Sequence, residues 1–217
     1  MPLERMNPVV PQTEYRGLRL LLHKVHCIDE TGSGMDEWGE DEIYMAAVAV
    51  DNNGQTSSNG LFHVRNFDDG EIKEYSPPKL LQHFNIREGG DSFPKIYSVS
   101  MALIEHDHGN LSKWFSDLLN AVSKKVQNYL LSVIGAVEGK PLGDLSAAIG
   151  WVLGQMIGWV KSWLEDDHLG NHVVQATINS YSGNWTSTGT ALTPIRTRDH
   201  KGDSSHYRVF YQWQLVP

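Results

Sequence analysis

Residues 206–216 read HYRVFYQWQLV, and this stretch alternates between apolar and more polar side chains at every second position. Tyr207, Val209, Tyr211, Trp213 and Leu215 lie on one face, and Arg208, Phe210, Gln212 and Gln214 lie on the other. Because successive side chains of a strand point to opposite sides, this period of two predicts a β-strand with one buried face. The predicted core face is aromatic and large.

Further strands are expected on the N-terminal side of this stretch. They are predicted at 17–28 (GLRLLLHKVHCI), 43–50, 61–67, 80–86 after Pro77-Pro78, 95–105 and 172–181. Turn-forming Gly, Pro, Asn and Asp residues separate them. Short strands at this spacing predict an antiparallel β-sandwich or barrel.

The segment between residues 112 and 164 has a different pattern. Its apolar residues recur at three- and four-residue steps, which is typical of helices. Gly139 ends the first predicted helix and Pro141 prevents its continuation. A second helix is expected from about residue 142 to 164. The sequence therefore predicts a mainly β protein with an α insertion: a flexible arm at 1–15, then a single β-sandwich domain over 16–217 with a two-helix hairpin inserted at about 110–165.

The second predicted helix is apolar on nearly every side, so it needs a partner surface. Gly150, Gly154 and Gly158 form a row of small residues that lets another backbone approach closely. Three roles remain open for the hairpin. It could pack on the sandwich, lie at a membrane surface, or form an interface with a protein partner.

The bulk composition narrows the function classes. The chain has 217 residues, 40% of them hydrophobic, and a net charge of -8. An acidic balance argues against nucleic acid, since phosphate binding needs clustered Lys and Arg, and it suits a cationic partner such as a metal ion. Cys27 is the single cysteine, so no disulfide can form within the chain. The N-terminal residues do not form a secretory signal and no segment is a clear transmembrane span, so a cytoplasmic or signal-independently exported protein is expected.

Three acidic segments lie at the ends of predicted strands. The first, CIDETGSGMDEWGEDEIY (27–44), has seven carboxylates between positions 29 and 42. The others are IEHDHGN (104–110) and EDDHLGN (165–171). Ca²⁺ takes roughly six to eight oxygen ligands, and loops at one end of a sandwich can supply them together. Taken one by one, the same segments could be solvated turns.

These segments resemble the loops of the C2 domain, a calcium- and phospholipid-binding β-sandwich. Asp29, a Gly-containing loop, and Asp41 just before Ile43-Tyr44 look like the family's first calcium loop. Glu105-His106-Asp107 resembles the Asp-x-Asp pair of the second, and Asp167-His168-Leu169-Gly170 resembles the segment that closes it. The resemblance implies calcium ligands at Asp29, Asp41, Glu105, Asp107 and Asp167. The chain departs from the family pattern where the whole hairpin would lie inside the second loop.

The expected function is that of a calcium-binding, non-catalytic module, either for calcium-dependent binding at a phospholipid surface or to a protein partner, or for structural stabilisation. One alternative is a membrane-active or toxin-like protein that works through the hairpin at 112–164. A weaker alternative is a metal-dependent hydrolase that uses His106, His108, His168 and His172 with nearby Asp residues, since a His/Asp set suits Zn²⁺. DHKGDSSHY (199–207) gathers Ser, His and Asp, but it is expected to be a polar turn.

Overall fold

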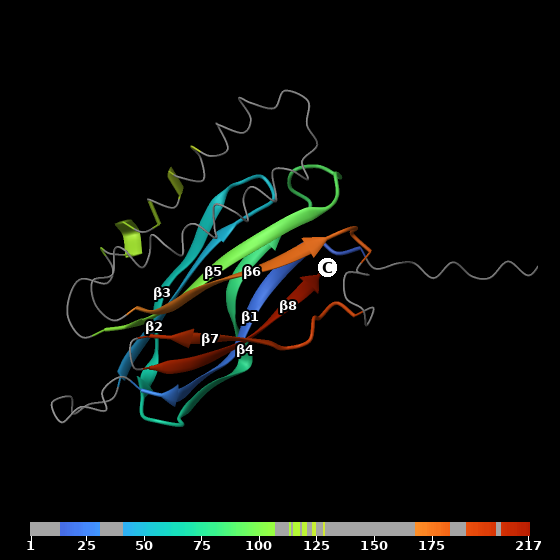
Figure 1. The fold of residues 1–217 in the computed structure, drawn as a ribbon. Coiled ribbons are helices and arrows are strands. Elements are labelled where there is room, and N and C mark those ends of the chain that lie inside the picture. The colour runs from blue at the N-terminus through green and yellow to red at the C-terminus, as the bar shows by residue number, and fades with distance from the viewer. Residues whose placement is uncertain are drawn as a thin grey trace, which may run out of the picture.

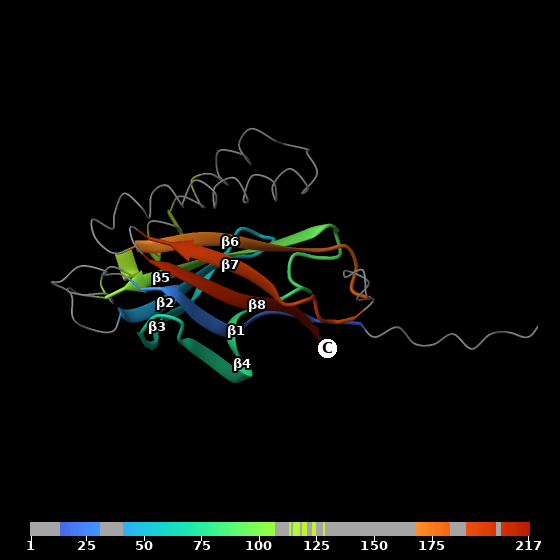
Figure 2. The same ribbon diagram turned by 60° about the horizontal axis from the view of Figure 1, so that its bottom comes forward.

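The computed structural model describes residues 14–30, 41–106, 168–182, 190–202 and 205–217, with scattered positions between 113 and 128. Its strands are β1 (Gly17–Asp29), β2 (Asp41–Val50), β3 (Thr56–Phe67), β4 (Ile72–Asn85), β5 (Lys95–Glu105), β6 (His168–Ile178), β7 (Arg196–Lys201) and β8 (His206–Val216). They form two antiparallel four-stranded sheets, ordered β4-β1-β8-β7 and β3-β2-β5-β6 (Figure 1). Seen from a second direction, the two sheets lie one over the other (Figure 2). The predicted mainly β, two-sheet antiparallel architecture is therefore confirmed.

The core lies between the sheets and is built from the alternation predicted for the longest strands. Leu18, Leu20 and Leu22 of β1 are fully buried, as the sequence pattern requires. β8 lies beside β1 in antiparallel register, with Leu20 opposite Trp213. Phe84 of β4 packs near the Trp213 ring, with 6.3 Å between the ring centroids. One hydrophobic cluster joins residues of both sheets, so the described strands share a single core.

The sheet β3-β2-β5-β6 is buried on both faces along its two central strands. Ile43 and Met45 point into the shared core, whereas Ala46 and Ala102 lie on the outer face and are also buried. Ala46 and Ala102 are register partners, so small side chains line the middle of this outer face. Small side chains there allow another element to approach closely.

Part of the cover on this outer side is helical. The described positions between residues 113 and 128 are helical. Phe115 is buried, and the Ser123 hydroxyl lies 2.7 Å from the Thr56 hydroxyl at the start of β3. The rest of the predicted hairpin and most of the predicted arm at 1–15 lie outside the described residues.

The strand predicted at 80–86 was wrong in its limits. The strand predicted to begin after Pro77-Pro78 begins instead at Ile72 and contains both prolines. The pairing with β1 passes from Glu74 to Lys79 through an irregularity, so neither proline has to donate a ladder hydrogen bond. β4 is an edge strand, where proline is tolerated because one side of the strand has no partner.

β7 was missed altogether. Its sequence RTRDHK has no apolar alternation, and residues 199–207 were expected to form a polar turn. The turn is shorter than predicted, because residues 199–201 end β7 and residues 206 and 207 begin β8. β7 forms through main-chain pairing with β8 at the sheet edge, where charged side chains can remain in solvent.

Candidate metal centre at the acidic end

The topology brings the predicted acidic segments to the same end of the sandwich. β1 ends at Asp29 and β2 begins at Asp41, so the first acidic loop joins the two sheets at this end. In the second sheet, Ile43 is the register partner of Glu105, and Ile104 pairs with His168. The segments after β5 and before β6 therefore start from the same end as the first loop. We call this region, at the described residues Asp29, Glu30, Asp41, Asp68, Asp69 and Glu105, the acidic end.

Two of the predicted ligands continue the inward-facing rows of their strands. Asp41 precedes Ile43 and Met45 on the core side of β2, and the residue is 5% exposed. Glu105 follows Met101 and Leu103 on the core side of β5 and is 9% exposed. Buried carboxylates are costly unless hydrogen bonds or a cation compensate their charge. Asp41 and Glu105 therefore lie buried at one end of the core, unlike solvated loop residues.

Asp41 is tied to the opposite sheet. The Tyr207 hydroxyl of β8 donates a hydrogen bond of 2.6 Å to Asp41 Oδ2. Burial and this hydrogen bond raise the pKa of Tyr207 far above its usual value, so the phenol stays protonated and acts as a donor. Phe67 packs edge-on against the Tyr207 ring, with 5.6 Å between centroids. Strand β8 therefore fixes the position of the first β2 carboxylate.

The turn between β3 and β4 adds carboxylates that the sequence prediction missed. Asp69 Oδ1 accepts a hydrogen bond of 2.7 Å from the Glu30 backbone N–H, directly after β1. The Cys27 N–H bonds to the Glu71 carbonyl oxygen at 2.9 Å. Glu71 itself is paired with Arg65 at 2.7 Å, which leaves Asp68 and Asp69 as the additional acidic side chains of this turn. The sequence Asp68-Asp69-Gly70 indicates a turn, but only the strand order places this turn beside the end of β1.

The accumulated negative charge of this region acts on Glu30. Burial raises the pKa of Glu30, and the neighbouring charges of Asp41, Asp69, Asp68 and Asp29 raise it further. A carboxylate surrounded by like charges favours its neutral form, and a bound cation would remove that penalty. Carboxylates from the first loop and from the β3–β4 turn thus form one electrostatic region.

The predicted ligand set is placed only in part. Asp29 lies exposed at the end of β1, and Asp41 and Glu105 lie buried at the same end. Asp107 and Asp167 lie outside the described residues. Within the described part of the chain, no three His, Cys, Asp or Glu side chains come close enough together to hold a metal ion. The donor chemistry fits Ca²⁺, which prefers carboxylate and carbonyl oxygens, but complete coordination requires further oxygens.

The histidines of the alternative hydrolase reading have other contacts. His172 Nε2 lies 2.6 Å from the Asp199 carbonyl oxygen, and its ring packs edge-on against His200 across the β6–β7 boundary. His106 packs edge-on against Tyr44 of β2. His108 and the His168 side chain lie outside what the structure describes. The contacts of His172 account for its position without a metal.

The fold and this site define a two-sheet antiparallel β-sandwich with a carboxylate-rich end. No family model matches the sequence, and no curated protein or solved structure is significantly similar to it. Among the described residues, no helix has the length and apolar character needed to cross a membrane.

Proposed function

We propose that the acidic end binds Ca²⁺, and that the protein is a calcium-dependent binding or calcium-stabilised module with a C2-like arrangement of loops. The observation that supports this most is the gathering of carboxylates from separate segments at one end of the sandwich. Asp41 and Glu105 would supply buried oxygens, and Asp29 and Asp69 would supply exposed ones. By the C2 resemblance, Asp107 and Asp167 would complete the set.

The proposed role of the ion is electrostatic. Carboxylates about 4 Å apart repel by roughly 4 kcal/mol per pair at an effective dielectric constant of 20. A divalent cation replaces this repulsion with attraction and fixes the loops that provide the ligands. In this proposal, calcium occupancy sets the geometry of the acidic end, and the loops around it then meet a phospholipid surface or a protein partner.

The test is the melting temperature of the full chain in metal-free buffer, with Ca²⁺, with Mg²⁺ and with Zn²⁺ at constant ionic strength. A ligand that binds only the native state at about 100 times its Kd stabilises by roughly 2.7 kcal/mol. For a chain of this length, about 2–4 °C per kcal/mol gives an expected rise of roughly 5–10 °C with Ca²⁺. Zn²⁺ should raise the melting temperature less, because the site offers oxygen ligands.

Three substitutions make the test specific. Glu105→Gln and Asp107→Asn should each abolish most of the calcium-induced rise, because each removes a proposed charged ligand. Glu88→Gln is the matched control, since Glu88 is an exposed carboxylate in the turn after β4, at the other end of the sandwich. No rise with millimolar Ca²⁺, or an equal loss in the Glu88 variant, would contradict the proposal.

A further inference from the structure

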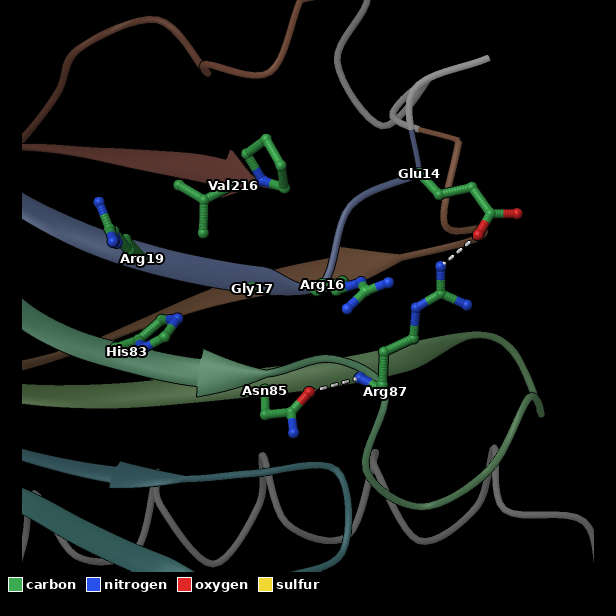
Figure 3. Close-up of a pocket in the computed structure, with 9 residues that line it drawn as sticks. Glu14, Arg16, Gly17, Arg19, His83, Asn85, Arg87 and Val216 are labelled. Carbon is green, nitrogen blue, oxygen red and sulfur yellow. Dashed lines mark hydrogen bonds and ion pairs between the residues drawn. The ribbon is translucent and has the colours of Figure 1, made fainter. Parts of the chain in front are cut away.

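A second charged region lies at the end of the sandwich opposite the acidic end. A pocket of about 900 Å³ opens there on the outer face of the sheet β4-β1-β8-β7 (Figure 3). Its charged side chains are those of Arg16, Arg19, Arg87 and Glu14, and the rest of the lining consists of Gly17, His83, Asn85, Val216 and Pro217. With three arginines and one glutamate, these side chains carry a local excess of positive charge, whereas the whole chain has a net charge of -8. This local excess of positive charge has no role in the proposed calcium site.

Strand register gathers these side chains on one face. Arg19 of β1 lies opposite His83 of β4, and Gly17 lies between Asn85 on one side and Val216 on the other. Leu18 and Leu20 point into the core, so residues 17 and 19 lie on the outer face. Figure 3 shows the Arg19 and His83 side chains toward one end of the pocket and Arg16 and Arg87 toward the other.

Glycine at position 17 leaves the space over the β1 backbone to its neighbours His83 and Val216. A Cβ atom there would lie 2.6 Å from His83 Nε2 and 2.6 Å from Val216 Cγ2, which is closer than such atoms can pack. The missing side chain therefore lets the His83 ring and the end of β8 come together over the β1 backbone. Strands β4, β1 and β8 therefore all contribute residues to the base of the pocket.

Arg87 is held in place by its neighbours. Its guanidinium donates to Glu14 Oε2 at 2.6 Å and lies over the Tyr181 ring, 3.7 Å from the centroid. The Tyr181 hydroxyl in turn donates to Asp91 Oδ1, and the buried Lys95 ammonium lies 3.1 Å from the same hydroxyl. At this end of the pocket, the Arg87 charge is thus paired with Glu14 and its guanidinium is positioned by Tyr181.

Among the described residues, Arg87 has an anionic partner in Glu14, whereas Arg16 and Arg19 have none. Neither forms an ion pair with any residue in the described part of the chain. The Arg19 Nε–H is buried and has no hydrogen-bond partner among these residues. A buried donor without an acceptor is uncommon in folded proteins and is a place where a ligand oxygen would be stabilised.

We propose that this pocket binds a small molecule through a carboxylate or phosphate group, with Arg16 and Arg19 as the charged contacts and His83 as a further polar contact. Guanidinium groups match the planar or tetrahedral oxygen arrangement of both anions. The volume lies within the roughly 300–1,000 Å³ of small-molecule sites. Because the pocket is remote from the acidic end, this proposal is independent of calcium binding.

The test is isothermal titration of the full chain with inorganic phosphate and, separately, with succinate, at ionic strength fixed with NaCl. The buffer should be freed of metal with a resin, because soluble chelators carry carboxylates that could occupy the pocket. Arg16→Gln and Arg19→Gln should each weaken binding about tenfold, as expected for loss of one charge-assisted hydrogen bond. Arg196→Gln is the matched control, since Arg196 is an exposed arginine on β7 outside the pocket.

Binding of phosphate alone would support the proposal with a phosphate-bearing ligand, and binding of succinate alone would support it with a carboxylate-bearing one. Binding of both, lost in the two pocket variants, would support a general oxyanion site. Failure of both probes to bind at millimolar concentration would overturn the proposal. Equal weakening in the Arg196 variant would overturn it as well, because the effect would then reflect overall charge.

Discussion

At the scale of a single residue, Cys27 is buried next to the acidic end. Its thiol is fully buried beside Tyr207 and Asp41, and burial raises its pKa to about 11. The side chain packs in the hydrophobic core between the sheets. At pH 8 a thiol with this pKa is only about 0.1% thiolate, so it is a poor nucleophile.

Labelling of Cys27 with iodoacetamide at pH 8 should therefore be at least about 100-fold slower in the native protein than in denaturant. Fast labelling of the native protein would contradict the buried position of the thiol.

The raised pKa of Cys27 also predicts a pH dependence of stability. Between about pH 8.5 and 11 the unfolded chain has lost the Cys27 proton while the native protein keeps it, so the free energy of unfolding should fall as pH rises through this window. Cys27→Ser should show a smaller fall, because a serine hydroxyl does not titrate there.

At the scale of secondary-structure elements, the outer face of the sheet β3-β2-β5-β6 is covered along its central strands. A sheet covered on one face only should show buried and exposed residues in alternation. β5 instead is buried along almost its whole length, and Ala102 on its outer face is 5% exposed. The contact between Ser123 and Thr56 indicates that a helical element lies on this side. For the described positions of the first predicted helix, these observations support packing on the sandwich, whereas the second predicted helix lies outside the described residues.

Ala102→Leu tests this cover. Extra methylene groups in a filled space cost about 1–3 kcal/mol, so we expect a loss of that size in the free energy of unfolding measured with urea. Thr177→Leu on β6 is the control, because Thr177 is exposed and a surface change of this kind stays within about 0.5 kcal/mol. An Ala102 variant as stable as the wild type would mean that the outer face is open.

At the scale of the whole molecule, the acidic end and the arginine-lined pocket lie at opposite ends of the sandwich. The acidic end follows Asp29 at the end of β1, whereas the pocket begins at Gly17, where β1 starts. Thirteen residues of extended strand span roughly 40 Å at about 3.3 Å per residue. Charges this far apart are screened at physiological ionic strength, where the Debye length is about 8 Å.

We therefore expect the two proposed sites to act independently. The Kd for succinate should change by less than about twofold when millimolar Ca²⁺ is added to metal-free protein, because additive behaviour is the rule for distant sites. Succinate is the suitable probe, since calcium phosphate would precipitate. A change of tenfold or more would show that the ends are coupled through the core, contrary to this expectation.

The sequence by itself determined the β-sandwich class, because a period of two in β1 and β8 specifies which residues are buried regardless of their partners. It also marked Asp29, Asp41 and Glu105, since carboxylates at strand ends are visible in the sequence. Only the tertiary structure decided that these residues share one end with Asp68 and Asp69, and that Arg16, Arg19 and His83 meet at the other. β7 likewise depended on its neighbour, because an edge strand of charged residues forms through pairing with β8 and not through its own pattern. Strand order and register are long-range properties, and local sequence periodicity carries no information about which strands become neighbours.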